Sequence, residues 1–122
     1  MMRTILVVDD NKTNLMLAKQ FLQGKNTVIP VLSGKMALNY LEKKQADLIL
    51  LDLLMPDMDG LETLESIRRL PNGKNVPVIF MTADDARDTK KQCLDAGAID
   101  FIRKPFDIME MISRIEKALE RR

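Results

Sequence analysis

Short apolar segments alternate with longer amphipathic segments along the whole chain. Residues 5–8, with the sequence ILVV, are apolar at every position, which is typical of a strand buried on both faces of a sheet. Further segments with the length and apolar content of strands cover residues 27–32, 48–51, 76–81 and 99–102. Pro30 has no backbone N–H to donate, so the second strand is expected at an edge of the sheet.

Apolar residues at helical spacing predict a helix after each strand. The predicted helices are residues 13–23, a segment capped by Ser33 that carries Met36, Ala37, Tyr40 and Leu41, a segment with Leu61, Leu64 and Ile67, residues 84–96, and a last segment with Ile108, Met111, Ile112, Ile115 and Leu119. Gly24 and the tripeptide 71–73 are expected to end the first and the third helix. This alternation indicates an α/β fold, a mostly parallel sheet with helices on both faces and right-handed crossovers.

The length of 122 residues is that of one ordinary domain, so residues 1–122 are expected to form a single domain. Apolar types make up 46% and charged types 30%, a balance typical of soluble globular proteins. No apolar run approaches the roughly 20 residues of a membrane helix. The first apolar run is stopped by Asp9 and Asp10, unlike a signal peptide. We therefore expect no membrane association.

Charge and rare residue types exclude several function classes. The net charge of +1 offers no general attraction to nucleic acid or anionic membranes, so no nucleic-acid contact is expected. Cys93 is the only cysteine, which rules out an internal disulfide and favours a reducing, cytoplasmic location. The absence of histidine excludes histidine-based acid–base catalysis, the common nucleophile triads and every zinc site that uses histidine.

Polar residues stand at the carboxyl ends of four predicted strands. Asp9 and Asp10 follow the first strand, Asp52 the third, Thr82 the fourth, and Lys104 comes soon after the fifth. In open parallel sheets, ligands bind at the carboxyl ends of the strands. Three carboxylates, one hydroxyl and one ammonium group are therefore expected at one edge of the sheet.

Each of these residues also has an ordinary structural explanation. Asp10 and Thr82 are good helix N-cap types, and Lys104 could be a solvated surface charge. The set is harder to explain in this way, because three adjacent carboxylates repel one another unless a cation lies among them. Hard oxygen ligands favour Mg²⁺ or a similar ion such as Mn²⁺. With such an ion, an aspartate nucleophile, a hydroxyl and an ammonium group suit phosphoryl transfer.

At these positions the sequence resembles the receiver domain of two-component response regulators, including chemotaxis regulators. Four segments carry the resemblance, which covers the whole chain: ILVVDDN at 5–11, DLLMPDMDG at 52–60, MTA at 81–83 and GAIDFIRKPF at 97–106. The resemblance implies a flavodoxin-like (βα)5 fold of three layers, doubly wound, with a five-stranded parallel sheet in the order 2-1-3-4-5. The segment 57–60 also has some likeness to a calcium-binding EF-hand loop, but Met55 stands where the first ligand belongs.

The family resemblance assigns a role to each residue of the set. Asp52 would accept the phosphoryl group, while Asp9, Asp10, Asp52 and the backbone carbonyl of Leu54 would hold Mg²⁺ or Mn²⁺, Asp9 partly through water. Thr82 would bond a phosphoryl oxygen and Lys104 would pair with the phosphoryl group. Phe101 would be the aromatic switch residue that turns inward as Thr82 moves, and the Lys104–Pro105 peptide would be cis.

The implied function is a phosphorylation-dependent switch that catalyses only its own phosphorylation and dephosphorylation. A sensor histidine kinase or a histidine phosphotransfer protein would be the donor, and a downstream protein would bind the face made by the fourth helix, the fifth strand and the fifth helix. Asp100 and Arg114 remain available for a phosphorylation-induced homodimer on this face, but the sequence does not support such a dimer, because Ile99 replaces an acidic residue found in many relatives. The apolar Leu54 side chain cannot orient a hydrolytic water, so the phosphoryl group is expected to be fairly long-lived.

Two alternatives belong to other functional classes. The first is a docking module that no longer needs phosphate, which would usually have lost the acceptor, the acidic pair or the lysine. The second is a Mg²⁺-dependent hydrolase of the haloacid dehalogenase kind, which needs a second aspartate two residues beyond the nucleophile. Leu54 occupies that position here.

Overall fold

The computed structural model describes residues 2–83, 87–105 and 107–120, and its centre is a parallel β-sheet. The strands in these ranges are β1 (Arg3–Val8), β2 (Asn26–Val31), β3 (Leu48–Asp52), β4 (Val78–Thr82) and β5 (Asp100–Arg103). Their order in the sheet is β2-β1-β3-β4-β5, and every neighbouring pair is parallel. The predicted α/β fold and strand order are confirmed, and β2 with its Pro30 is an edge strand.

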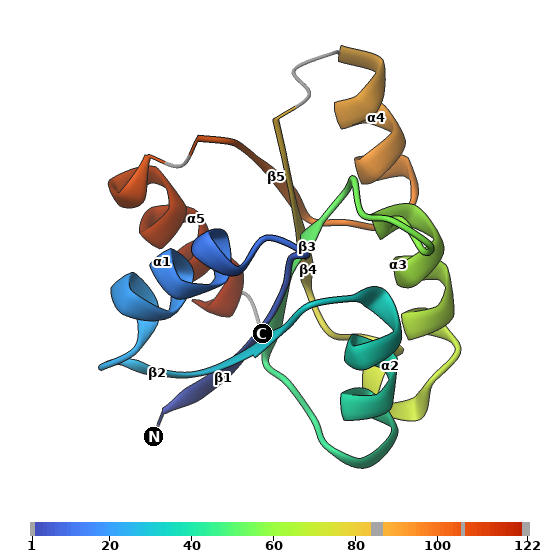
Figure 1. Ribbon diagram of the computed structural model, residues 1–122, viewed down its shortest axis with the longest axis horizontal. Helices are drawn as coiled ribbons and strands as arrows, with labels where there is room; N and C mark the ends of the chain where they lie inside the picture. The colour runs from blue at the N-terminus through green and yellow to red at the C-terminus, as the bar shows by residue number, and fades with distance from the viewer. Residues whose placement is uncertain (1, 84–86, 106, 121–122) are drawn as a thin grey trace.

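Helices cover both faces of the sheet and complete a three-layer arrangement. The helices are α1 (Lys12–Leu22), α2 (Gly34–Lys43), α3 (Gly60–Arg68), α4 (Arg87–Asp95) and α5 (Ile108–Glu120), with a short 3₁₀ helix, η1 (Pro71–Gly73), before β4. Figure 1 shows α1 and α5 together on one face, and α2, α3 and α4 on the other. The crossovers between parallel strands thus place α1 and α5 on one side of the sheet and the three consecutive helices α2, α3 and α4 on the other (Figure 1).

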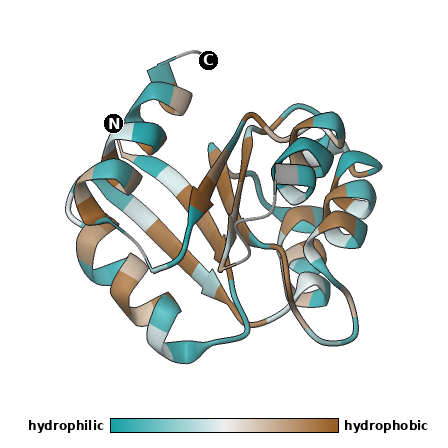
Figure 2. Ribbon diagram, turned by 90° about the horizontal axis from the view of Figure 1, so that it is seen from above, coloured by the Kyte–Doolittle hydropathy of each residue, from teal (hydrophilic) through white to brown (hydrophobic). Residues whose placement is uncertain are grey.

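Two apolar cores lie on either side of the sheet. Side chains alternate along a strand, so Leu6 and Val8 of β1 join the core beneath α2, α3 and α4, whereas Ile5 and Val7 join the core beneath α1 and α5. All four are at most 1% exposed. Figure 2 shows the largely apolar strands between the two helical layers. Burial on both faces explains why these strands are continuous apolar runs in the sequence.

Helix starts are secured by side-chain caps. The side chain of Ser33 accepts a hydrogen bond from the N–H of Met36 at 3.1 Å, which confirms the predicted cap of α2. Asp59 caps α3 in a capping box with Glu62, so the segment once compared with an EF-hand loop is a loop and helix start. The N-cap of α1 is Asn11 and not Asp10, which leaves the Asp10 carboxylate unused as a cap.

The observed element bounds differ from the predicted ones by one or two residues. β3 includes Asp52 and β4 includes Thr82, because the N–H of Leu53 donates to the carbonyl of Met81 at 2.9 Å and continues the pairing to the strand ends. β4 begins after Pro77 and not at Val76. The fourth helix was predicted from residue 84, and residues 84–86 lie outside the described ranges.

Each helix buries a stripe of apolar residues against the sheet and exposes its opposite side to solvent. Met111, Ile115 and Ala118 form the buried stripe of α5. Cys93 of α4 is fully buried and packs as a small core residue, and burial raises the pKa of its thiol to about 11. No helix within the described ranges combines the length and the apolar content needed to cross a membrane.

Candidate functional site

Four strands bring polar residues to the same edge of the sheet. Asp9 directly follows β1, Asp52 and Thr82 end β3 and β4, and Lys104 directly follows β5. Backbone pairing holds two of these positions beyond the strands: the Asp9 N–H donates to the Val31 carbonyl at 3.1 Å, and the Lys104 N–H donates to the Thr82 carbonyl at 2.7 Å. Strand geometry thus places residues that are up to 95 positions apart in one small region.

Three carboxylates form a cluster at this edge. Oxygen atoms of Asp9, Asp10 and Asp52 lie within 4.8 Å of one another, and this is the group that the described residues offer for a metal ion. Asp9 is fully buried and Asp52 is 4% exposed, whereas Asp10 faces solvent. The cluster therefore has two buried members and one open side through which an ion or a phosphoryl donor could approach.

Lys104 connects the two buried carboxylates. Its Nζ lies 2.8 Å from Oδ2 of Asp9 and 3.3 Å from Oδ2 of Asp52. Only 15% of its side chain is exposed, so it is not a solvated surface charge. The other oxygen of Asp9, Oδ1, accepts the N–H of Asn11 at 2.9 Å. Asn11 was not predicted as a site residue from the sequence. Its position, directly after two aspartates and before a predicted helix, could have indicated this role.

The charges at the site do not balance. Burial is the main cause that raises the pKa of the Asp52 carboxyl from its ordinary value of 3.8 to about 6. The Lys104 ammonium opposes this increase, and the like charge of Asp9 adds to it. Near pH 7, Asp52 is mostly ionised, and three negative groups then face one positive group. A bound cation would offset the excess charge.

The donor set suits a hard divalent cation. Carboxylate oxygens are the protein ligands that Mg²⁺ and Mn²⁺ prefer, and Mg²⁺ usually keeps several waters, which the exposed side at Asp10 would allow. Leu54, whose backbone carbonyl is the further expected ligand, lies in the loop after β3 with its side chain 63% exposed. The residues present therefore fit Mg²⁺ or Mn²⁺.

The two expected switch residues are both buried. Thr82 is 1% exposed at the end of β4, and Phe101 of β5 is 8% exposed within the core beneath α2, α3 and α4. The aromatic ring already lies inside the protein in this structure, and its movement with Thr82 stays a prediction. The Lys104–Pro105 peptide bond is cis, as the family resemblance implies.

Asp100 and Arg114, expected to be available for contacts with a second molecule, are engaged within the chain. The Arg114 guanidinium pairs with the Asp100 carboxylate, and its Nε lies 3.0 Å from Oε1 of Glu110. The same Asp100 oxygen accepts the N–H of Phe101 at 2.8 Å. The two paired side chains stay partly exposed, at 35% for Arg114 and 28% for Asp100, so their availability to a second molecule stays a prediction.

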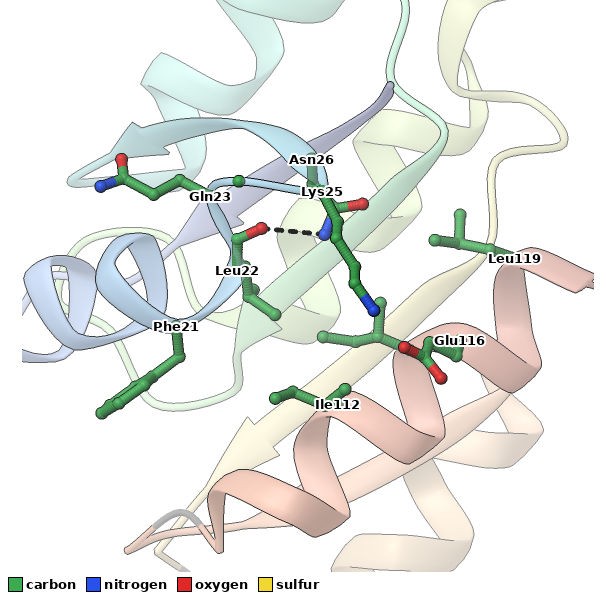
Figure 3. A pocket seen from close by; sticks show the side chains of 10 residues that line it. Phe21, Leu22, Gln23, Lys25, Asn26, Ile112, Glu116 and Leu119 are labelled. Atoms are coloured by element: carbon green, nitrogen blue, oxygen red, sulfur yellow. Dashed lines mark hydrogen bonds between the residues drawn. The ribbon is translucent and has the colours of Figure 1, made fainter. Parts of the chain in front are cut away.

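A separate hollow of about 310 Å³ lies between the end of α1 and α5. Figure 3 shows its apolar wall, which includes Leu22, Ile112 and Leu119, and the Lys25 side chain reaching toward Glu116. The side-chain nitrogen of Asn26 donates to the Leu22 carbonyl at 2.9 Å, which ties the start of β2 to α1. No residue of the acidic cluster lines this hollow, so it is distinct from the candidate site.

A family model described as the response regulator receiver domain matches residues 5–116. The chain belongs to this family. Among curated relatives, response regulator GtcR of Aneurinibacillus migulanus is 37% identical, over 99% of this chain and 49% of that protein. A probable cyclic di-GMP phosphodiesterase of Vibrio cholerae is 35% identical, over 96% of this chain and 26% of that protein. The receiver chain thus spans about half or less of the length of these relatives.

Solved structures of receiver domains have the same fold. Chemotaxis protein CheY4 of Vibrio cholerae has a TM-score of 0.92 and 26% identity, with 98% of this chain and 100% of that chain covered. The receiver domain of sensor histidine kinase PA1611 from Pseudomonas aeruginosa has a TM-score of 0.89 and 30% identity, with 98% and 99% covered. The PA1611 receiver domain has a magnesium ion coordinated in its active-site cleft.

The raised pKa of Asp52 predicts an unusual pH dependence of stability in the metal-free receiver domain. The folded protein holds the Asp52 proton more tightly than the unfolded chain, so stability should fall as pH rises from about 4 to about 6. We expect Asp52→Asn to raise the free energy of unfolding at pH 7 by roughly 1 to 3 kcal/mol, and to change it little at pH 4. Urea unfolding in EDTA measures both values. A wild type at least as stable as the variant at pH 7 would contradict this prediction.

Proposed function

We propose that this receiver domain is a phosphorylation-dependent signalling switch in which Asp52 accepts a phosphoryl group from a phosphohistidine donor, with Mg²⁺ or Mn²⁺ bound. The donor is a sensor histidine kinase or a histidine phosphotransfer protein. The observation that carries the proposal is the cluster of Asp9, Asp10 and Asp52 at the strand ends, with Lys104 bridging its two buried members. Receiver domains are signalling switches and not classical enzymes, in agreement with this assignment.

The chemical step requires an ionised Asp52. One carboxylate oxygen attacks the phosphorus, the phosphorus–nitrogen bond of the phosphohistidine breaks, and its electron pair returns to the imidazole. A pKa of about 6 leaves Asp52 mostly ionised near pH 7 and makes its oxygen more basic than that of an ordinary aspartate. The Lys104 ammonium, 3.3 Å from the attacking group, would offset charge on the transferred phosphoryl oxygens. A bound Mg²⁺ would supply further positive charge at the same oxygens.

The product changes the charge of the site. By analogy with other phosphorylated side chains, the acyl phosphate carries about 1.5 to 2 negative charges, in place of the single negative charge of the ionised Asp52 carboxylate. The Thr82 hydroxyl and Lys104 are the groups at the neighbouring strand ends that would bind the new oxygens. Lys104 would then exchange its contact with the Asp52 carboxylate for one with the phosphoryl oxygens, and its contact with Asp9 would weaken. The proposed response is a shift of the Thr82 and Phe101 positions, which biases a two-state equilibrium.

The proposed readout surface is the face made by α4, β5 and α5, where a downstream protein would bind. Phe101 lies in β5, and Asp100 of β5 pairs with Arg114 of α5. A displacement at the end of β5 would therefore alter contacts that belong to this face. Ile99, 40% exposed just before β5, adds apolar surface. A phosphorylation-induced homodimer on this face would have to exchange the internal Arg114 pairs for pairs between two molecules.

The remaining assignments extend the proposal to the whole chain. We propose that residues 1–122 form one receiver domain in the cytoplasm, without nucleic-acid or membrane contacts of its own. A related response regulator and a related probable cyclic di-GMP phosphodiesterase are each at least about twice as long as this chain. In such proteins, the process that the receiver domain regulates depends on the parts of the protein outside the receiver domain. The switch, and not a particular output, is the function proposed for this chain.

The two alternative functions have less support. A docking module independent of phosphate does not require the acceptor, the acidic group and the lysine, yet all are present and in contact or close together. A hydrolase of the haloacid dehalogenase kind needs a carboxylate where the exposed apolar Leu54 stands. The geometry therefore favours the phosphorylated switch.

Incubation with acetyl phosphate and Mg²⁺ tests the acceptor. We expect wild-type protein to gain the mass of one phosphoryl group, and Asp52→Asn to gain none, because the amide is not a nucleophile. Intact-mass spectrometry records the gain, and an EDTA sample shows its dependence on metal. Phosphorylation of the Asp52→Asn variant would overturn the assignment of the acceptor. Absence of phosphorylation from both acetyl phosphate and a phosphorylated histidine phosphotransfer protein would overturn the switch itself.

Asp10 is expected to be needed for metal binding but not for folding, because its side chain is exposed and caps no helix. Asp10→Ala should weaken Mg²⁺ binding at least about tenfold, as measured by isothermal titration calorimetry, and slow phosphorylation by acetyl phosphate at low Mg²⁺. Asp95→Ala, which removes an exposed carboxylate at the end of α4, is the matched control. Equal Mg²⁺ affinities of the two variants would remove Asp10 from the site.

The Leu54 side chain is expected to prolong the phosphorylated state, since it cannot hydrogen-bond a hydrolytic water. Leu54→Asn should shorten the half-life of the aspartyl phosphate severalfold, because its amide can orient that water. Leu54→Ala separates this effect from the loss of apolar bulk and should leave the half-life nearer to that of wild type. The decay of the phosphorylated mass after removal of acetyl phosphate measures all three. An unchanged half-life in Leu54→Asn would refute the argument.

A further inference from the structure

We propose that Gly60, the first residue of α3, is a positioning residue for Asp52. Because Gly60 has no side chain, the backbone at Asp52 can lie where the Asp52 carboxylate is correctly placed relative to Lys104, Asp9 and Asp10. This inference rests on the proposed function of the cluster as a Mg²⁺-dependent phosphoryl-acceptor site. Gly60 has no titratable or ligating group of its own. Its contribution is the space that it leaves behind the acceptor.

The backbone of the acceptor strand lies directly against Gly60. A Cβ atom built at residue 60 would lie 2.5 Å from the carbonyl oxygen of Asp52 and 2.8 Å from Cα of Leu53. It would also lie 2.8 Å from Cε1 of Phe80. Real Cβ atoms essentially never come within 3.0 Å of a heavy atom outside their own and the adjacent residues, so any side chain at residue 60 must displace these groups.

The groups around Gly60 have little room to move. Phe80 is completely buried in the middle of β4, and Leu53 is 6% exposed. The N–H of Leu53 donates to the carbonyl of Met81 at 2.9 Å, and the N–H of Gly60 donates to the carbonyl of Leu53 at 2.8 Å. Close packing of this kind transmits displacement instead of absorbing it.

The loop between Asp52 and Gly60 has little slack as well. Its two ends are joined by the hydrogen bond between the Gly60 N–H and the Leu53 carbonyl. Within it, Asp57 adopts a φ of +68°, and the N–H of Met58 donates to the Pro56 carbonyl at 2.7 Å in a tight turn. The capping box of Asp59 fixes the point where α3 begins. A methyl group at residue 60 would therefore shift the end of β3.

A shift at the end of β3 would act on the reacting carboxylate. Asp52 is the last residue of that strand, and its side chain meets Lys104 at 3.3 Å and the other carboxylates within 4.8 Å. Metal coordination and in-line attack both depend on positions held within a fraction of an ångström. The expected result of a small displacement is weaker Mg²⁺ binding and slower phosphorylation in a protein that is still folded.

A second glycine provides a matched control. A Cβ at Gly73 would lie 2.2 Å from the carbonyl oxygen of Ile67. This clash with backbone is at least as severe as that at Gly60, and it occurs in a second buried glycine. Gly73 belongs to η1, which precedes β4, so it lies toward the opposite edge of the sheet from the carboxyl end of β4. Gly73→Ala should therefore destabilise the fold without altering the acidic cluster.

The test compares wild type, Gly60→Ala and Gly73→Ala under conditions in which urea unfolding shows each to be folded. We expect both variants to have lower unfolding midpoints. Only Gly60→Ala should weaken Mg²⁺ binding by about tenfold or more in calorimetry, with a comparable loss in the rate of phosphorylation by acetyl phosphate. In metal-free protein, amide NMR shifts at Asp9, Asp52 and Lys104 should change in Gly60→Ala and remain as in wild type in Gly73→Ala.

Wild-type Mg²⁺ affinity in a folded Gly60→Ala variant, with unchanged amide shifts at the cluster, would overturn the inference. If Gly60→Ala does not fold, Gly60→Ala with Phe80→Leu replaces it, because the smaller residue removes the ring atom at 2.8 Å while the contact with the Asp52 carbonyl remains. Phe80→Leu alone is its control. Failure of both Gly60 variants to fold would assign Gly60 to folding and overturn the positioning role. If wild type binds no Mg²⁺, the proposed function fails, and the metal-free amide shifts alone decide the position of Asp52.

Discussion

The arrangement of this receiver domain depends on like charges being held together. Two of its three clustered carboxylates, Asp9 and Asp52, are nearly inaccessible to water, and one ammonium group, Lys104, contacts both. Burying a carboxylate without full compensation costs free energy, which is why the pKa of Asp52 is high. Such a site gains from any ligand that brings positive charge to the oxygens. The feature that is predicted to weaken the metal-free fold would also give the proposed site its affinity for a cation.

The rest of the fold supplies the rigidity that this charge arrangement requires. β1, β3 and β4 are buried on both faces, and their side chains divide between two cores. Strands packed in this way cannot separate to relieve repulsion at their ends without opening both cores. The close contact of Gly60 with the backbone of Asp52 and Leu53 extends this packing to the loop that follows the acceptor. The packing of the two apolar cores thus opposes the electrostatic repulsion between the carboxylates at the site.

The path proposed from the site to the surface runs through β5. The Lys104 N–H is hydrogen-bonded to the carbonyl of Thr82, so the ends of β4 and β5 are joined at the site itself. Three residues earlier in the chain, Phe101 is packed in the core, and its N–H is bonded to Asp100, the partner of Arg114 on α5. A movement of Thr82 or Lys104 in response to phosphate would act on these contacts first. This contiguity supports the α4, β5 and α5 face as the readout surface.

Much of the molecule could be predicted from local patterns, because the periodicity of apolar residues reports directly on secondary structure. The run ILVV at 5–8 predicted a strand buried on both faces, Ser33 predicted a helix cap, and polar residues after four strands predicted a common site edge. The sequence motifs, once compared with a known family, also indicated the strand order and the cis Lys104–Pro105 bond, both of which the structure contains. These features depend on residues close together in the chain or on a familiar motif.

Contacts between distant segments were decided only by the tertiary structure. The pairing of Lys104 with Asp9, the internal Asp100–Arg114 ion pair and the approach of Gly60 to the acceptor backbone are set by how strands and helices pack, and local periodicity carries no information about those distances. Tertiary structure also decided that Asn11, and not Asp10, caps α1, because the path of the chain after β1 determines which side chain reaches the start of the helix. The sequence determined which groups arrive at the edge of the sheet. The packing of the sheet determined which of them touch.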